Sequence, residues 1–253
     1  MRKGVTMAKI SVPEFIKELD SYFAREDLRG AGECLLKWRE KAAKSGDLSG
    51  ELTVLNEMIG YYRQTKEEAE GLASVHDAFV LITRLGIENK LSSATVYLNG
   101  ATTMKAFGKS AQAMEYYEHT EKIYKENLPE EHPLTAGLYN NMALALEDIG
   151  DNEKAEKYFR RAIAITEKIE KSELETAVSC INLAHLLYKK DIENEEINPL
   201  MERALDILEN PDYFGYQRYA FTCRKSAPSF GFFGFFAAEK ALNERADRIY
   251  AGS

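Results

Sequence analysis

The chain has 253 residues, of which 45% are hydrophobic and 29% charged, a composition typical of ordered globular proteins. Its 41 acidic and 33 basic residues give a net charge of −8, which argues against nucleic acid and anionic membranes as partners. No apolar run resembles a signal peptide or a membrane span, and the three cysteines lie far apart in the sequence. We therefore expect a cytoplasmic protein without a disulfide framework.

The first expected element is a helical hairpin within residues 1–51. Ser11, followed by Pro13 and Glu14, has the pattern of a helix start, with an N-cap, a proline in the first turn and a capping-box acid. The apolar pattern of the units that follow reappears here at an offset of 40 residues, so this hairpin is a degenerate first unit. Its pattern residues are Phe15, Leu19, Tyr22, Ala31, Leu35 and Trp38.

From residue 52 onward, large, small and aromatic residues recur with a period of 42 residues, each unit predicting two helices. A single helical hairpin cannot bury its apolar face alone, so neighbouring hairpins must stack. The sequence thus predicts an all-α solenoid of about six antiparallel helical hairpins in one continuous domain. The five regular units are residues 52–93, 94–135, 136–177, 178–219 and 220–253. The clearest unit is defined by Tyr139, Met142, Ala143, Leu146, Gly150, Ala155, Phe159 and Ala162.

Two units depart from the pattern. The fourth has Ile192 where a glycine is expected, and its Asn198-Pro199 pair predicts a second helix that starts late, with Asn198 as its N-cap. The fifth places Pro228 inside its first helix, where loss of a backbone hydrogen bond predicts a kink or an end of the helix.

One segment carries a distinctive sequence, in which residues 131–136 read EHPLTA, residues 139–143 read YNNMA and residues 153–158 read EKAEKY. This segment closely resembles the 42-residue tetratricopeptide repeats of the kinesin light chain class, which many bacterial proteins of unassigned role also carry. The resemblance implies a right-handed α-α superhelix whose first helices line a concave groove. It carries no expectation of kinesin binding, because nothing else in the chain resembles that protein.

Asparagines recur on the helix face that the resemblance assigns to the groove. Counted from the first residue of each unit, position 5 holds asparagine three times and position 6 twice. A carboxamide both donates and accepts, so a column of them could bind the main chain of an extended peptide; the alternative is that they only bridge neighbouring helices. The predicted groove asparagines are Asn56, Asn99, Asn140, Asn141 and Asn182.

Basic residues recur at position 12 of the same face, as Arg63, Lys105 and Lys189, and Arg224 occupies position 5 of the last unit. They favour an acidic or carboxylate-bearing ligand, unless they form only a solvated helix face. The lysines of the carboxylate clamp found in chaperone-binding repeats are absent, so chaperone-tail binding is not expected.

The last hairpin is rich in aromatic residues. Phe221 and Phe232 are predicted to form an apolar pocket at one end of the groove. The alternatives are a hydrophobic lid packed on the fourth hairpin, or a homodimer interface. The aromatic residues are Tyr213, Phe214, Tyr216, Tyr219, Phe221, Phe230, Phe232, Phe233, Phe235 and Phe236.

No residue pattern points to catalysis, a metal or a cofactor. His76, His119, His132 and His185 lack metal-ligand spacing, and no glycine-rich phosphate loop follows a strand. We therefore predict a non-enzymatic adaptor that binds a protein or extended peptide in its groove. The alternatives are a peptide-sensing regulator that changes superhelical shape on binding, and a scaffold that self-associates through the aromatic hairpin.

Overall fold

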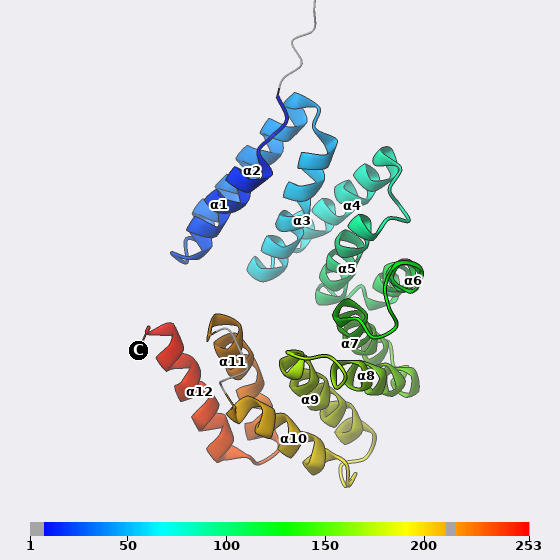
Figure 1. The fold of residues 1–253 in the computed structure, drawn as a ribbon, viewed down its shortest axis with the longest axis vertical. Helices are drawn as coiled ribbons and strands as arrows, with labels where there is room; N and C mark the ends of the chain where they lie inside the picture. Colours follow the sequence, from blue (N-terminus) through cyan, green and yellow to red (C-terminus); the bar gives the residue numbers. More distant parts are fainter. Residues whose placement is uncertain (1–7, 211–215, 253) are drawn as a thin grey trace, which may run out of the picture. The chain divides into compact units, whose positions relative to one another are not determined.

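The computed structural model describes residues 8–210 and 216–252, and all regular secondary structure in these residues is α-helical (Figure 1). The predicted all-α fold of the α-α superhelix class is confirmed. The helices follow one another as six hairpins. The twelve helices of the described residues are α1 (Val12–Phe23), α2 (Leu28–Ser45), α3 (Leu48–Thr65), α4 (Glu68–Leu85), α5 (Leu91–Ala106), α6 (Ser110–Asn127), α7 (Pro133–Asp148), α8 (Asn152–Thr166), α9 (Glu173–Lys190), α10 (Ile197–Glu209), α11 (Tyr216–Phe232) and α12 (Phe236–Tyr250).

The chain forms two compact units, each containing several repeats. From here on, the first unit is the part that ends at Ile123, and the second unit is the part that begins at Tyr124 within α6. The predicted repeat borders fall a few residues inside the first helix of each hairpin; α3, for example, begins at Leu48 rather than at residue 52. The apolar pattern marks where a helix begins to pack, whereas the helix itself starts at its cap several residues earlier.

In the first unit, polar side chains at the N-cap positions start the helices α1 and α3. Ser11 Oγ accepts a hydrogen bond from the backbone N–H of Glu14 at 3.4 Å, which confirms the predicted start of α1. Asp47 caps α3 by accepting from the N–H of Gly50 at 3.0 Å, and its second oxygen accepts from the N–H of Ile10 at 3.1 Å. One carboxylate thus starts α3 and ties the segment before α1 to it.

The core of the second unit uses the residues that define the repeat. Tyr139 and Met142 on α7 and Phe159 on α8 are buried, and the small residues Ala143 and Ala155 between them are completely inaccessible. Alanine at these positions lets α7 and α8 approach closely, and the aromatic rings fill the space toward the next hairpin.

The turn between the two helices of a hairpin explains why the fourth repeat has Ile192 where a glycine was expected. Gly150 has φ +85° in the left-handed region after α7, and Lys66 takes the equivalent position after α3 with φ +63°. After α9 the chain is instead extended at Asp191, with φ −155°, so no glycine is needed where Ile192 stands. A longer loop follows before α10.

The N-cap position of α10 is Glu196, so the prediction that Asn198 is the cap is wrong. The side chain of Asn194 explains the earlier start, because its Oδ1 accepts a hydrogen bond from the N–H of Glu196 at 2.9 Å. Asn198 and Pro199 therefore lie in the first helical turn, where a proline costs no intrahelical hydrogen bond.

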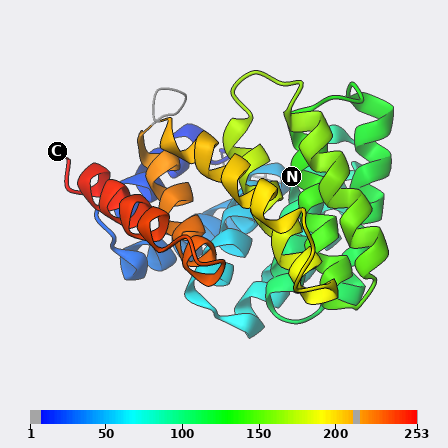
Figure 2. The same ribbon diagram turned by 90° about the horizontal axis from the view of Figure 1, so that it is seen from below.

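α11 continues through the exposed Pro228 to Phe232, so the proline does not end the helix. Figures 1 and 2 both show α11 and α12, in orange and red, lying side by side, and α11 also contacts α9. Phe230 and Ala227 next to the proline are buried. Packing on two neighbours therefore offsets the backbone hydrogen bond that the proline removes.

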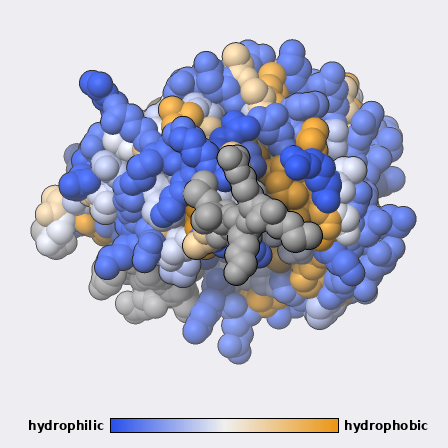
Figure 3. Space-filling model, turned by 90° about the horizontal axis from the view of Figure 1, so that it is seen from above, coloured by the Kyte–Doolittle hydropathy of each residue, from blue (hydrophilic) through white to orange (hydrophobic). Residues whose placement is uncertain are grey.

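The exposed surface reflects the charged composition. Figure 3 shows a face that is mostly hydrophilic, with smaller hydrophobic areas beside the grey atoms. None of the helices in the described part of the chain combines the length and hydrophobicity needed to span a bilayer.

Candidate functional site

The groove asparagines pair across neighbouring first helices in each unit. In the first unit, Nδ2 of Asn99 on α5 donates to Oδ1 of Asn56 on α3 at 2.9 Å. In the second unit, Nδ2 of Asn182 on α9 donates to Oδ1 of Asn140 on α7 at 3.0 Å. All four side chains are half-buried. The amides therefore bridge helices, as one of the two predicted roles requires.

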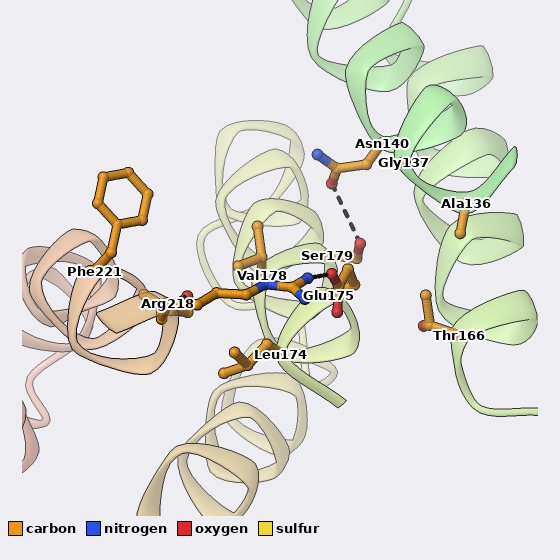
Figure 4. A pocket seen from close by; sticks show the side chains of 11 residues that line it. Ala136, Gly137, Asn140, Thr166, Leu174, Glu175, Val178, Ser179, Arg218 and Phe221 are labelled. Atoms are coloured by element: carbon orange, nitrogen blue, oxygen red, sulfur yellow. Dashed lines mark hydrogen bonds and ion pairs between the residues drawn. The ribbon is translucent and has the colours of Figure 1, made fainter. Parts of the chain in front are cut away.

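In the second unit the bridge leaves part of each amide available, whereas in the first unit Nδ2 of Asn56 also donates to Oε1 of Glu57 at 3.5 Å. Oδ1 of Asn140 also accepts from Oγ of Ser179 at 3.3 Å, but no described residue accepts a hydrogen bond from its Nδ2. Figure 4 shows this nitrogen on the side of the amide away from Ser179. Oδ1 of Asn182 accepts from no described residue. Asn141 is half-buried on α7 and does not line the cavity beside Asn140.

A cavity of about 350 Å³ lies beside Asn140, between α7, α9 and α11 of the second unit (Figure 4). Its walls are mainly apolar, with Leu174 and Val178 contributed by α9 and Phe221 by α11. Phe221 is 57% exposed, so this ring is accessible at the mouth of the cavity. The predicted groove residues Asn140 and Phe221 thus meet at one site.

A charged pair lies at the edge of this cavity. Arg218 on α11 forms an ion pair with Oε1 of Glu175 on α9, drawn as a dashed line in Figure 4. Oε2 of the same glutamate is buried and has no hydrogen-bond partner among the described residues. A buried carboxylate oxygen without a donor is costly, so it would favour a ligand that brings an N–H. The cavity therefore combines an amide donor, a carboxylate acceptor and an apolar wall.

Glu175 and Arg218 are site residues that the sequence interpretation missed. A signal was present for the first, because Ser172 and Glu175 have the spacing of a capping box. The side chain of Ser172 makes no capping hydrogen bond, however, and Glu175 pairs with Arg218 instead. Nothing in the sequence pattern indicates that pairing.

The first unit has a cavity of the same volume at the equivalent repeat positions. A cavity of about 350 Å³ is lined by Asn56 and Thr95, which stand two repeats before Asn140 and Ser179. Its other walls include Leu52 and Val96, and it has no acidic or aromatic lining residue. The same repeat positions therefore form a cavity in each unit, but only the second has charged and aromatic groups.

The predicted basic line is largely neutralised within the chain. Lys189 pairs with Glu147, which occupies the same position one repeat earlier, and Arg224 pairs with Asp247 on α12. Lys105 is half-buried and interacts within the chain. These residues therefore give the described groove face little net positive charge.

Arg63 differs from the other basic groove residues. Its Nη1 donates to Oγ1 of Thr103 at 3.1 Å and to the carbonyl oxygen of Asn99 at 3.4 Å. No carboxylate of the described chain pairs with it, and burial lowers the pKa of the guanidinium. Neutral oxygens therefore hold a half-buried cation on this face of the first unit.

Phe221 and Phe232 line two different cavities rather than a single one. Eleven residues separate them on α11, which corresponds to about 16 Å along a helix. Phe232 is also 57% exposed, whereas Tyr219 and Phe230 of the same hairpin are buried. The hairpin therefore both packs internally and presents rings at its surface. Tyr213 and Phe214 lie outside the described residues.

Residues 134–210, which include nearly all of α7 to α10, match the family model described as tetratricopeptide repeat. No curated protein matches the chain.

Solved structures resemble the chain in fold. The nearly identical TPR-like repeats of a Podosopora anserina protein assigned as a kinesin light chain align with 18% identity and a TM-score of 0.57 over 79% of this chain and 95% of that one. BtubC (BKLC) from P. vanneervenii aligns with 19% identity and a TM-score of 0.58 over 94% of this chain and 91% of that one. A Rap protein complexed with competence and sporulation factor aligns with 13% identity and a TM-score of 0.58 over 94% of this chain and 74% of that one. At these identities the likeness concerns the fold.

Proposed function

We propose that the chain, whose residues 134–210 match the tetratricopeptide-repeat model, binds a protein partner, without catalysis, by holding an extended segment in the α7–α9–α11 cavity. The observation that carries the proposal is the pair of unused polar atoms there. Nδ2 of Asn140 has no acceptor and Oε2 of Glu175 has no donor among the described residues.

The main chain of an extended peptide supplies the groups that these atoms lack. A peptide carbonyl would accept a hydrogen bond from Asn140, and a peptide N–H would donate to Glu175. Main-chain hydrogen bonds of this kind give affinity with little sequence preference. Specificity would come from one apolar side chain resting against Val178 and Phe221, whose burial is favourable.

The fold supports a binding role of this type. One protein of similar fold, the Rap protein, is complexed with competence and sporulation factor. Repeat solenoids commonly use the surface formed by neighbouring repeats for binding, and this cavity lies between three consecutive first helices.

A peptide-display selection on the purified chain tests the proposal, followed by affinity measurements on the enriched peptide. Phe221→Ala should weaken binding about tenfold, because an aromatic residue at a binding cavity commonly contributes more than 1 kcal/mol. Phe236→Ala is the matched control, since Phe236 is 70% exposed and does not line the cavity. Selection without any enriched motif, or equal binding by both variants, would contradict the proposal. Small-angle scattering with and without the peptide would then distinguish a rigid adaptor from a sensor that changes shape.

Self-association is the second candidate function, favoured by the exposed Phe232 and Phe236. Sedimentation equilibrium across a hundredfold range of protein concentration tests it. A concentration-dependent dimer that Phe236→Ala converts to a monomer would support a scaffold, whereas a strict monomer would exclude one.

A further inference from the structure

A second cavity of about 350 Å³ lies where α9 and α11 end, away from the peptide cavity, and one side of it is aromatic. Tyr188, Phe232 and Phe233 line it. The ring of Phe232 stands nearly perpendicular to both others, at 80° to Tyr188 and 88° to Phe233, with centroid distances of 5.1 and 4.9 Å. These edge-to-face contacts fix the rings as a wall, and the 57% exposure of Phe232 shows that part of this wall is open.

Acidic residues line the same cavity. Glu193 and Glu195, in the loop between α9 and α10, line it and are exposed. Neither forms an ion pair with any described residue. The nearby cations are committed elsewhere, since Lys189 pairs with Glu147, Lys190 with Glu156, and Arg160 with both Glu156 and Glu196. Two carboxylates therefore line the same cavity as the aromatic rings without a compensating charge from the described residues.

Other aromatic rings of this chain have one of its own cations near the ring. Lys41 lies over the Trp38 ring at 4.3 Å, Arg161 over Tyr139 at 4.8 Å, and Lys225 over Phe221 at 5.8 Å. In the described part of the chain, no lysine or arginine lies over the three rings of the second cavity. The vacant position beside these rings has the surroundings that a cation prefers.

His185 does not supply the missing charge. Its ring contacts Phe232 and Phe233 with centroid distances of 5.2 and 4.8 Å, and Nε2 lies 2.9 Å from Oγ of Ser229. Burial lowers the pKa of this imidazole below its usual 6.5, so it is neutral at pH 7. The histidine supports the aromatic wall as a packed, uncharged ring.

We propose that this aromatic-acidic cavity binds a cationic side chain, lysine or arginine, of the protein partner. The faces of aromatic rings attract cations, and the two carboxylates that line the same cavity add Coulomb attraction. The proposal rests on the proposed function in that the occupant belongs to a protein. It adds that the partner carries a basic residue outside the segment held in the α7–α9–α11 cavity.

The test uses n-butylammonium chloride, which has the alkyl stem and charge of lysine, and 1-butanol as its neutral isostere. The probes are titrated into the full-length chain while NMR follows the ring signals of Tyr188, Phe232 and Phe233. We expect saturable shifts with the ammonium that weaken as salt is added, and much smaller shifts with the alcohol. The readout needs no peptide, so it remains informative if the peptide selection fails.

Variants test separately how the aromatic rings and the glutamates contribute to ammonium binding. Phe232→Leu should abolish the shifts at Tyr188, and the double change Glu193→Gln with Glu195→Gln should weaken ammonium binding about fivefold. The matched controls are Phe236→Leu and Glu202→Gln, which are exposed and do not line the cavity. Circular dichroism checks that all variants fold.

Three outcomes would overturn the proposal. Equal shifts with 1-butanol would identify a purely apolar pocket, and undiminished ammonium binding by the double glutamine variant would remove the role of the acids. Ring shifts that depend on protein concentration in the absence of any probe would identify a second copy of the chain as the occupant.

Discussion

Asn182 on α9 donates a hydrogen bond to Oδ1 of Asn140 on α7, and Ser179 donates to the same oxygen. One carboxamide oxygen therefore joins two consecutive repeats through two donors. Loss of the Asn140 side chain would therefore leave both of these hydrogen bonds unmade.

Replacing Asn140 with alanine should lower the free energy of unfolding by about 1 kcal/mol, because the buried Ser179 and the half-buried Asn182 lose their acceptor. Asn182→Ala should cost less, since only one hydrogen bond is lost and the oxygen keeps Ser179. The two effects should not add in the double variant, which already lacks the shared bond. Urea unfolding of all four proteins measures the coupling; strict additivity would mean that the bond does not stabilise the stack.

The left-handed turn positions predict a contrast between Gly150 and Lys66. Gly150→Ala should lower the free energy of unfolding by about 1 kcal/mol, because alanine disfavours positive φ. A Cβ added at Gly150 meets no atom within 4 Å, so the cost would be backbone strain alone. Lys66→Gly at the equivalent turn should remain within about 0.5 kcal/mol of the native value, because relief of strain opposes the added flexibility of the unfolded chain. Thermal unfolding compares the two, and equal destabilisation would refute the argument.

An ion-pair network on α8 predicts a stability effect that depends on pH. Arg160 binds both carboxylate oxygens of Glu196 at 2.9 Å and also pairs with Glu156, which accepts from Lys190 as well. The hydrogen bond from Arg160 holds the pKa of Glu196 below its usual 4.5, and that from Lys190, followed by Arg160, does the same for Glu156.

Carboxylates with a lowered pKa in the folded state contribute stability that is fully present above pH 4.5 and is lost as the pH falls through the lowered value. Arg160→Met should therefore cost about 1 kcal/mol at pH 7, a modest value because the groups are exposed. The difference in free energy of unfolding between this variant and the native chain should vanish once the pH falls below the lowered pKa values of the two glutamates. Lys157→Met, at an exposed position of the same helix without an ion pair among the described residues, is the control. Destabilisation by Arg160→Met that is independent of pH would point to lost packing instead.

The three buried thiols should be unreactive in the folded protein. Burial raises the pKa of Cys34 and of Cys180 to about 11, and it raises that of Cys223 as well. Because the thiolate is the reactive form, a disulfide reagent at pH 8 should modify the native chain far more slowly than the chain in urea. Glu202→Cys, at an exposed site on α10, should react at once and serves as the positive control. Rapid modification of the native chain would indicate local opening around these residues.

The sequence predicted the fold well because the packed positions recur at a fixed period. Tyr139 and Phe159 were assigned to the interior from spacing alone, and both are buried. Pro228 shows the limit of local rules, since contacts of α11 with its neighbours outweigh the lost backbone hydrogen bond. Tertiary packing of this kind is not visible in a single stretch of sequence.

The candidate site was only partly predictable. Helical periodicity placed Asn140 and Phe221 on the side of their helices away from the packed residues, and the family resemblance implied that this side lines the groove. Glu175 and Arg218 could not be paired, because they lie 43 positions apart and meet only through the packing of α9 on α11. The repeat borders chosen from the apolar pattern also assigned both residues to the ends of the preceding units, although each stands in the first turn of its helix.

The asparagine pairs also give the groove a direction. In both units the later amide donates to the earlier one, from Asn99 to Asn56 and from Asn182 to Asn140. In the second unit the NH₂ group that remains lies on α7 and the carbonyl oxygen that remains lies on α9. A chain laid across these helices therefore meets a donor first and an acceptor second, and reversing it exchanges the groups that they face. In the proposed mode of binding, the way that two side-chain amides share a single hydrogen bond would therefore favour one N-to-C orientation of the bound segment.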